Sequence, residues 1–185
     1  MEEKKAFFAK LIEDRIVVWN SKEGSELYKM GFFGKPLGIA KPKIAEFDTP
    51  VNIDLIEGLY LLEKGIINVY NSDNQLQFNE LKEHARSIYD NFDLNYMVYK
   101  DLREHGYVVL PGIKFGCEYA IYEHGPGIDH SPYMVSVRAP GEKLTSTDIV
   151  RAGRLATSVR KRFIIALPNP ENDQINYIMF KWFKA

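Results

Sequence analysis

The sequence has little of what marks secreted, zinc-binding or membrane proteins. It contains one cysteine and four histidines, so Cys117 has no partner for an internal disulfide and no paired zinc-ligand spacing occurs. No run of about 18 apolar residues is present to cross a membrane, and MEEKKAFFAK lacks the apolar core of a secretory signal. We therefore expect a soluble, cytoplasmic protein in which Cys117 is a buried hydrophobic residue.

An excess of one sign of charge is also nearly absent, because the net charge of the 185 residues is −1. The two halves nevertheless differ: residues 1–95 hold 12 Lys and Arg against 16 Asp and Glu, whereas residues 96–185 hold 12 against 9. A modest basic surface on a near-neutral protein favours a shaped RNA over indiscriminate binding of nucleic acid. The basic residues of the second half concentrate at Arg151, Arg154, Arg160, Lys161 and Arg162.

Hydrophobic content of 45% is ample for packed cores, and the pattern of residues 1–91 predicts a small α/β domain. The expected elements are one or two strands in 6–19, a turn at SKEGSE (21–26), an irregular stretch at 31–38, a short strand at 44–47, a helix from a cap at Asn52 to a stop at Gly65, a strand at 66–70 and a helix at 78–89.

Residues 92–185 form the second predicted domain, with the boundary near Asn91. The pattern predicts helices at 94–105 and 148–161 and strands at 107–111, 117–122, 132–137, 163–167 and 175–182. This domain should contain a mixed β-sheet of about five strands flanked by helices. The predicted fold class of the whole chain is therefore α+β.

Polar groups suited to chemistry occur on three elements of the second domain. Tyr122 ends a predicted strand and His130 precedes the next one, and a loop of glycine, proline and aspartate between them includes Asp129. Arg151, Arg154, Ser158 and Lys161 fall within one arc of the predicted helix, with Ile149, Gly153 and Ala156 opposite to pack on the sheet. Taken alone, basic residues at a helix end more often complement the helix dipole and stay solvated.

Three ordered blocks, YKDLREHGYVVLPGIKFG, IYEHGPGIDHSPYMVSV and DIVRAGRLATSVRK, make residues 95–185 resemble the catalytic half of the archaeal tRNA-splicing endonucleases. The first half is similar to the N-terminal domain of the same proteins through IDLIEGLYLLEKGII. The resemblance implies metal-independent excision of introns from precursor tRNA at a bulge-helix-bulge fold, with 2′,3′-cyclic phosphate and 5′-hydroxyl ends. It implies no cofactor.

The catalytic residues that the resemblance implies are Tyr122, His130 and Lys161. Arg154 would stack on a bulge nucleotide, with Arg151 beside it on the RNA-binding face. The chain has no arginine after Arg162 to match a second stacking residue of the family, for which Lys181 is a weak candidate.

The resemblance also implies a homotetramer. Glu171 and Asp173, in the acidic loop PNPENDQ, would enter a basic cleft on a neighbouring subunit, and the terminal strand YIMFKWF would pair across a dimer interface. By itself the loop is more typical of a solvated hairpin tip. An alternative function, from the same resemblance, is a non-catalytic structural or RNA-binding subunit of such an assembly.

RNA is cleaved through its own 2′-oxygen when a base, an acid and a cation are in place. A histidine supplies a proton near neutrality, whereas an unperturbed tyrosine pKa near 10 leaves about one molecule in a thousand deprotonated at pH 7. We therefore expect Lys161 both to lower the pKa of Tyr122 and to stabilise the phosphorane. Apart from the resemblance, the pattern favours Tyr122 as a core aromatic, and His130 is as readily a surface histidine; His105 and His124 are further candidates.

Overall fold

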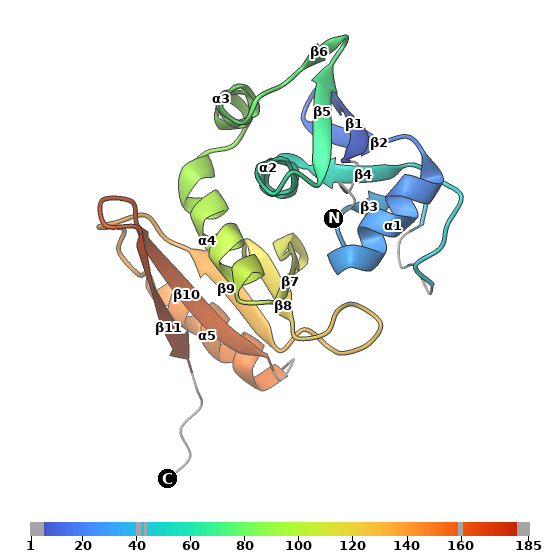
Figure 1. Cartoon of the computed structure of the whole chain (residues 1–185). Helices are drawn as coiled ribbons and strands as arrows, with labels where there is room; N and C mark the ends of the chain where they lie inside the picture. Colours follow the sequence, from blue (N-terminus) through green and yellow to red (C-terminus); the bar gives the residue numbers. More distant parts are fainter. Residues whose placement is uncertain (1–5, 40–41, 43, 159–160, 181–185) are drawn as a thin grey trace. The chain divides into compact units, whose positions relative to one another are not determined.

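The computed structural model describes residues 6–39, 42, 44–158 and 161–180. The chain divides into two compact units, residues 1–92 and 93–185 (Figure 1). Each unit is built around its own β-sheet, and helices and strands occur in both. The predicted α+β class is confirmed.

The first unit carries a six-stranded sheet of order β3-β4-β2-β1-β5-β6, in which β1 and β5 are parallel and the other pairs antiparallel. Its elements are β1 (Phe7–Ile12), β2 (Arg15–Val18), α1 (Ser21–Gly31), β3 (Lys35–Pro36), β4 (Val51–Asp54), α2 (Leu55–Glu63), β5 (Ile67–Asn71), β6 (Asn74–Gln75) and α3 (Phe78–Ile88).

Alternation along the central strands of this sheet builds the first core. Ile16 of β2 and Ile53 of β4 are register partners, and both are fully buried. Helix α2 approaches them closely, since a Cβ added at Gly58 would lie 2.2 Å from Ile16 Cδ1. A larger residue at position 58 therefore has no room without displacing the core.

Three predictions in the first unit are wrong. The expected turn at 21–26 is part of helix α1. The Asn20 side chain accepts hydrogen bonds from the backbone N–H groups of Lys22 and Glu23 and so caps this helix. The polar residues of its first turns are also common in turns, which is why the pattern did not predict a helix. Residues 44–47 form no strand. Helix α2 is capped by Asp54 instead of Asn52, which lies in strand β4.

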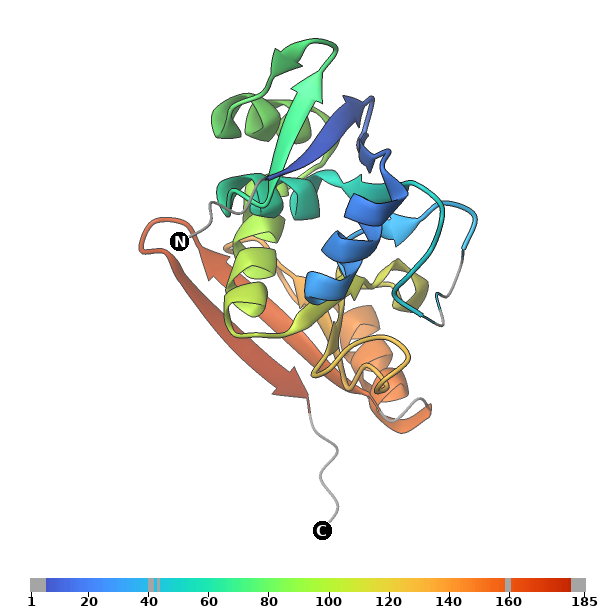
Figure 2. The same cartoon turned by 45° about the vertical axis from the view of Figure 1, so that its right-hand side comes forward.

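The second unit carries a five-stranded sheet of order β11-β10-β9-β8-β7, with β9 and β10 parallel and the other pairs antiparallel. Figure 2 shows the long hairpin of its last two strands. The elements are α4 (Phe92–Glu104), β7 (Val108–Pro111), the 3₁₀ turn η1 (Ile113–Phe115), β8 (Tyr119–Tyr122), β9 (Tyr133–Val137), α5 (Ser146–Ser158), β10 (Arg162–Asn169) and β11 (Gln174–Phe180).

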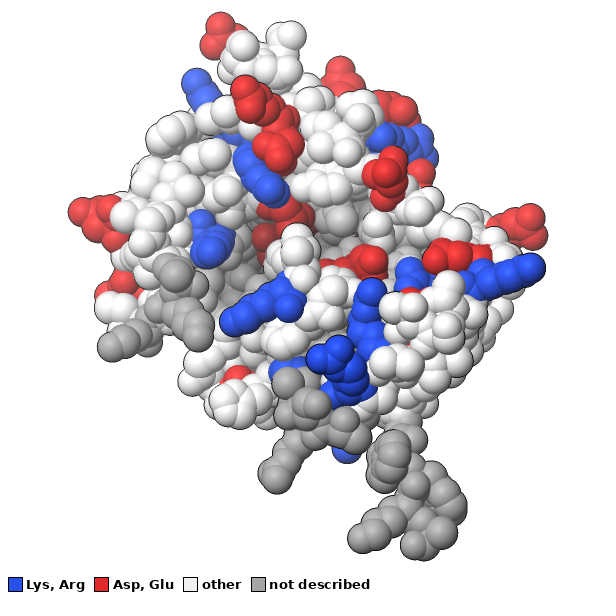
Figure 3. Space-filling view, turned by 180° about the vertical axis from the view of Figure 1, so that it is seen from behind, with Lys and Arg blue, Asp and Glu red and all other residues white. Residues whose placement is uncertain are grey.

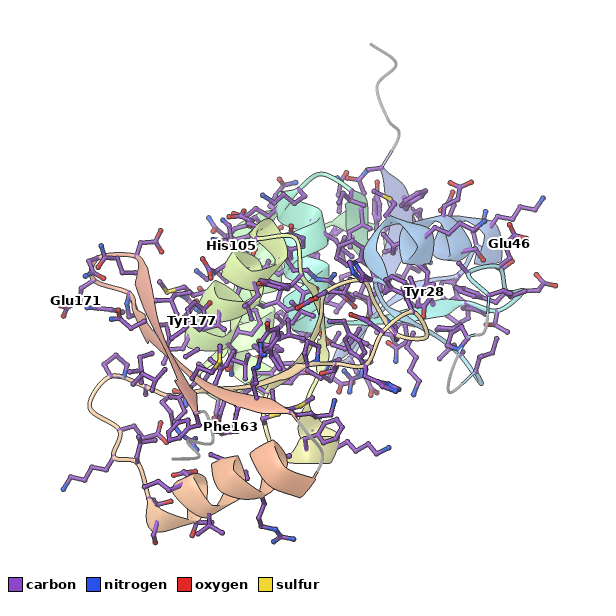
Figure 4. The ribbon with its side chains drawn as sticks, turned by 90° about the horizontal axis from the view of Figure 1, so that it is seen from below. Tyr28, Glu46, His105, Phe163, Glu171 and Tyr177 are labelled. Carbon is purple, nitrogen blue, oxygen red and sulfur yellow. The ribbon has the colours of Figure 1, made fainter. Side chains whose placement is uncertain are left out.

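The two faces of this sheet are covered by different helices. On one face the ring of Tyr119 lies 5.9 Å from that of Tyr99 of α4, and Tyr177 of β11 donates a hydrogen bond to Asp101 of α4 over 2.5 Å. On the other face Phe163 is buried in a core that includes Ala152 of α5. Tyr177 and Phe163 mark the two sides in Figure 4. The predicted mixed sheet flanked by helices is therefore present.

Helix α5 differs from its prediction in two ways. Its buried residues are Ala152 and Asp148, with Leu155 packed against the core, whereas Ile149 is 55% exposed; the predicted packing face was wrong. The helix also ends at Ser158. Lys161 lies outside it, directly before β10, where its backbone N–H donates to the carbonyl of Leu155.

Candidate active site

The sheet topology of the second unit collects the ends of three strands at one edge. Because β8 and β9 are antiparallel, the carboxyl end of β8 lies beside the amino end of β9, and because β9 and β10 are parallel, the amino end of β10 joins them. Tyr122 is the last residue of β8, His130 lies three residues before β9, and Lys161 immediately precedes β10. All three predicted catalytic residues therefore lie where the ends of these three strands meet.

Tyr122 is half-buried and packs against the core beneath α5. Burial, and secondly the negative charge of Asp129, raise the pKa of its phenol above the usual value of 10. We had expected Lys161 to lower this pKa, but the structure gives the opposite direction. Tyr122 therefore holds its proton firmly when no substrate is bound.

The loop between Tyr122 and His130 is built around the carboxylate of Asp129. One oxygen accepts the backbone N–H groups of Glu123 and His124 at 3.0 and 3.1 Å, and the other accepts that of Gly125 at 2.9 Å. Burial alone would raise the pKa of Asp129, yet these three hydrogen bonds bring it below its usual value. Gly125, with φ of 128°, adopts a backbone shape that favours glycine.

Lys161 is held next to His130 by the backbone. Its ammonium group donates a hydrogen bond to the carbonyl of Ser131, a residue that is only 3% exposed. It also lies 5.1 Å from the centre of the Phe115 ring, within cation–π range. Burial lowers the pKa of Lys161, and the side chain is only partly buried, so a phosphate can reach it.

The histidines occupy different settings. The His130 side chain is exposed, between the fixed positions of Asp129 and Ser131. His124 is also exposed, in the same loop. His105 is at the end of α4, where its Nδ1 lies 3.5 Å from the Asp101 carboxylate. Of the three, His130 is the one flanked by residues that contact both the loop directly after Tyr122 and the side chain of Lys161.

The predicted RNA-binding arginines both lie on α5. Arg151 donates from Nη1 to the carbonyl of Gly116 over 2.7 Å, so part of its guanidinium is engaged by the chain itself. Arg154 is exposed one turn further on. Lys and Arg side chains gather on the second unit in the lower half of Figure 3. Arg160 and Lys181, named from the sequence, lie outside the described residues.

The acidic pair predicted to dock on a neighbouring subunit lies at the turn between β10 and β11. Glu171 is exposed there, at the tip labelled in Figure 4, and its N–H donates to Asn169 Oδ1 over 3.1 Å. Asp173 is exposed too and has a φ of 54°. The chain thus presents both carboxylates on a tight, internally bonded turn.

Three further observations concern the thiol, metal binding and membrane spans. Cys117 is 5% exposed, as predicted, and burial raises the pKa of its thiol to about 11. Among the described residues no three His, Cys, Asp or Glu side chains are grouped closely enough to hold a metal ion. Within the same part of the chain, no helix has the length and apolar character that crossing a membrane requires.

Comparison with known proteins now defines the class. Residues 92–177 match the family model described as the tRNA intron endonuclease catalytic C-terminal domain, and residues 8–82 match its N-terminal domain. The chain belongs to the tRNA intron endonuclease family.

Proteins named tRNA-splicing endonuclease are similar to this chain over nearly its whole length. A tRNA-splicing endonuclease of Hyperthermus butylicus is 44% identical over 95% of this chain and 98% of its own. Those of Sulfurisphaera tokodaii and Saccharolobus islandicus are 42% and 38% identical, over 94% and 95% of this chain and 97% and 98% of theirs.

Sequence reasoning missed the groups that hold the candidate residues in place. Asp129 was noted only as a turn former and a neighbour of His130, although aspartate side chains commonly hydrogen-bond backbone N–H groups of their own loop. The Ser131 carbonyl and the Phe115 ring gave no signal, because any residue has a carbonyl and Phe115 is one of 11 phenylalanines.

Proposed function

We propose that this chain is the catalytic subunit of an endonuclease that excises introns from precursor tRNA at bulge-helix-bulge junctions. Membership of the family and relatives named tRNA-splicing endonuclease support the substrate. The observation that carries the proposal is the meeting of Tyr122, His130 and Lys161 at one edge of the second sheet, with Lys161 bonded to the residue after His130.

The reaction is a transphosphorylation that needs no metal. Tyr122 removes the proton from the 2′-hydroxyl, the 2′-oxygen attacks the adjacent phosphorus, and the bond from phosphorus to the 5′-oxygen breaks as His130 gives that oxygen a proton. The products are a 2′,3′-cyclic phosphate and a 5′-hydroxyl. Lys161 stabilises the charge on the non-bridging oxygens of the phosphorane.

The raised pKa of Tyr122 restricts how this base works. A phenol that keeps its proton in the free enzyme must lose it as the substrate binds or in the transition state itself. Lys161, whose ammonium is held by the neutral carbonyl of Ser131 and the ring of Phe115, provides compensating charge once the phosphodiester arrives. The charge of Lys161 therefore stabilises the transition state more than it stabilises a deprotonated Tyr122 in the free enzyme.

RNA binding in this proposal rests on shape. Splayed bulge bases present flat faces, and an arginine guanidinium stacks on them without reading sequence. Exposed Arg154 suits that role. Arg151, anchored to the Gly116 carbonyl, has donors left for a backbone phosphate.

Assembly completes the proposal as a homotetramer. The outer edge of β11 has no strand partner among the described residues, and Ile178 and Met179 on it are 45% and 40% exposed. Such an edge favours pairing with a second copy. Glu171 and Asp173, on their tight turn, would then dock on a basic cleft of a further copy.

The test is incubation of the purified chain with a bulge-helix-bulge RNA in excess EDTA, followed by analysis of the fragment ends. Cyclic phosphate and 5′-hydroxyl ends are expected, and a fully base-paired RNA of the same composition is the control. Cleavage that requires added metal contradicts the mechanism. Tight binding without cleavage would instead identify a non-catalytic subunit that needs a second chain.

A further inference from the structure

The segment Asp129-His130-Ser131 connects the three candidate catalytic residues through its two ends. At one end the Asp129 carboxylate accepts N–H groups from Glu123, His124 and Gly125, which directly follow Tyr122. At the other end the Ser131 carbonyl accepts the Lys161 ammonium. His130 lies between them, so its backbone is fixed from both sides.

We propose that Asp129 is a positioning residue of the reaction, whose carboxylate, seated in a cradle of three consecutive backbone N–H groups, fixes Tyr122 and His130 relative to each other. The inference rests on the proposed function. It assigns to Asp129 no contact with the substrate.

The geometry of the cradle supports a carboxylate over any other group. Two N–H donors converge on Oδ2 and a third on Oδ1, all at 2.9–3.1 Å, so both oxygens must be acceptors. The loop closes further through the N–H of Asp129, which donates to the Gly125 carbonyl over 3.1 Å, and through a bridge between Pro126 and Asp129. An amide at position 129 turns an NH₂ group toward at least one N–H donor.

Asp129 has a second effect, on charge. Besides burial, its carboxylate is the group that raises the pKa of Tyr122. This charge adds to burial in stabilising the protonated phenol, and a protonated phenol donates a hydrogen bond to an incoming phosphate oxygen where a phenolate would repel it. The residue that orients the base thus also makes its proton harder to remove.

The structure separates this role from general support of the fold. Within the part of the chain that the structure describes, the hydrogen bonds of Asp129 go to residues 123–125 of the same loop and its bridge to Pro126, and Asp129 is not part of the buried core. Loss of its side chain therefore affects the loop more than the sheet beneath it.

The test compares Asp129→Asn and Asp129→Ala with the control Asp73→Asn, an exposed aspartate of the first unit. Asp129→Asn should lower kcat on the bulge-helix-bulge RNA about tenfold and Asp129→Ala about a hundredfold, each with KM within about twofold, because misplaced groups lose rate more than binding. Asp73→Asn should match the wild type.

A spectroscopic measurement adds a readout that mere structural support would not change. With 3-fluorotyrosine incorporated and the Tyr122 resonance assigned through Tyr122→Phe, Asp129→Asn should move the titration midpoint of Tyr122 to lower pH by about half a unit or more, as removal of a nearby negative charge requires. A lower kcat despite a more easily ionised phenol identifies lost positioning. Unchanged kcat and an unchanged midpoint overturn the proposal.

Amide hydrogen exchange of the wild-type chain decides the question even if the variants do not fold. The backbone N–H groups of Glu123, His124 and Gly125 should exchange slowly for an exposed loop, because each is bonded to Asp129. Fast exchange at all three positions contradicts the cradle. This readout needs no cleavage assay, so it also distinguishes failure of the cradle from failure of the proposed function.

Discussion

Replacing Lys161 by methionine isolates the role of its charge. Methionine keeps an unbranched apolar chain beside Phe115 but removes the ammonium that donates to the Ser131 carbonyl. One donor aimed at developing negative charge is worth about 2.7–4 kcal/mol. We therefore expect kcat to fall by about 10²–10³ while KM changes little, since the lost interaction belongs to the transition state.

The cost of Lys161→Met to folding should be much smaller. The folded chain loses one hydrogen bond and one cation–π contact, each worth about 1 kcal/mol net, and regains part of the cost of desolvating the ammonium. The free energy of unfolding should thus fall by less than about 2 kcal/mol. Single-turnover cleavage and urea unfolding measure the two effects, with Lys143→Met, at an exposed lysine, as control. A kcat within about threefold of the wild type would refute the reasoning.

The remaining predictions concern the base, the assembly and the core. In a His130→Ala variant, kcat should rise about tenfold per pH unit from pH 6 to 9, since the raised pKa of Tyr122 leaves its deprotonation incomplete over that range. Adding Tyr122→Phe should abolish that slope. A kcat independent of pH in the single variant would exclude Tyr122 as the base. Glu171→Lys with Asp173→Lys should convert tetramers to dimers by light scattering, and an unchanged mass would count against docking. Phe163→Ala should lower the free energy of unfolding by about 3–5 kcal/mol in urea, because Phe163 is 1% exposed; a loss under 1 kcal/mol would contradict the packing.

The elements that the sequence predicted well are those with a strong apolar period. The strands of the second sheet alternate or run apolar, as β8 and β9 do, and both were found within two residues of their predicted bounds. Helix α1 was missed because Ser, Lys, Glu and Gly resemble a turn, and the capping bonds of Asn20 that favour the helix appear only in three dimensions.

In the candidate site, the candidate residues themselves were predicted but the groups that hold them in place were not. The resemblance to the endonuclease family pointed to Tyr122, His130 and Lys161, and their catalytic roles stay predictions. Their supports were not foreseeable: a backbone carbonyl such as that of Ser131 carries no sequence signature, and Lys161 leaves the helix because the parallel pairing of β10 with β9 begins at the next residue, Arg162. The pKa of Tyr122 was predicted in the wrong direction because burial and Asp129 both raise it.

The central claim is that His130 gives the departing 5′-oxygen its proton, and a leaving-group substitution tests it most directly. His130→Ala should slow cleavage of the ordinary bulge-helix-bulge RNA by about 10²–10⁴. A substrate with sulfur in place of the 5′-oxygen leaves as a thiolate, which needs no acid, so on this substrate the variant should cleave at nearly the wild-type rate. An equal defect of His130→Ala on both substrates would contradict the account.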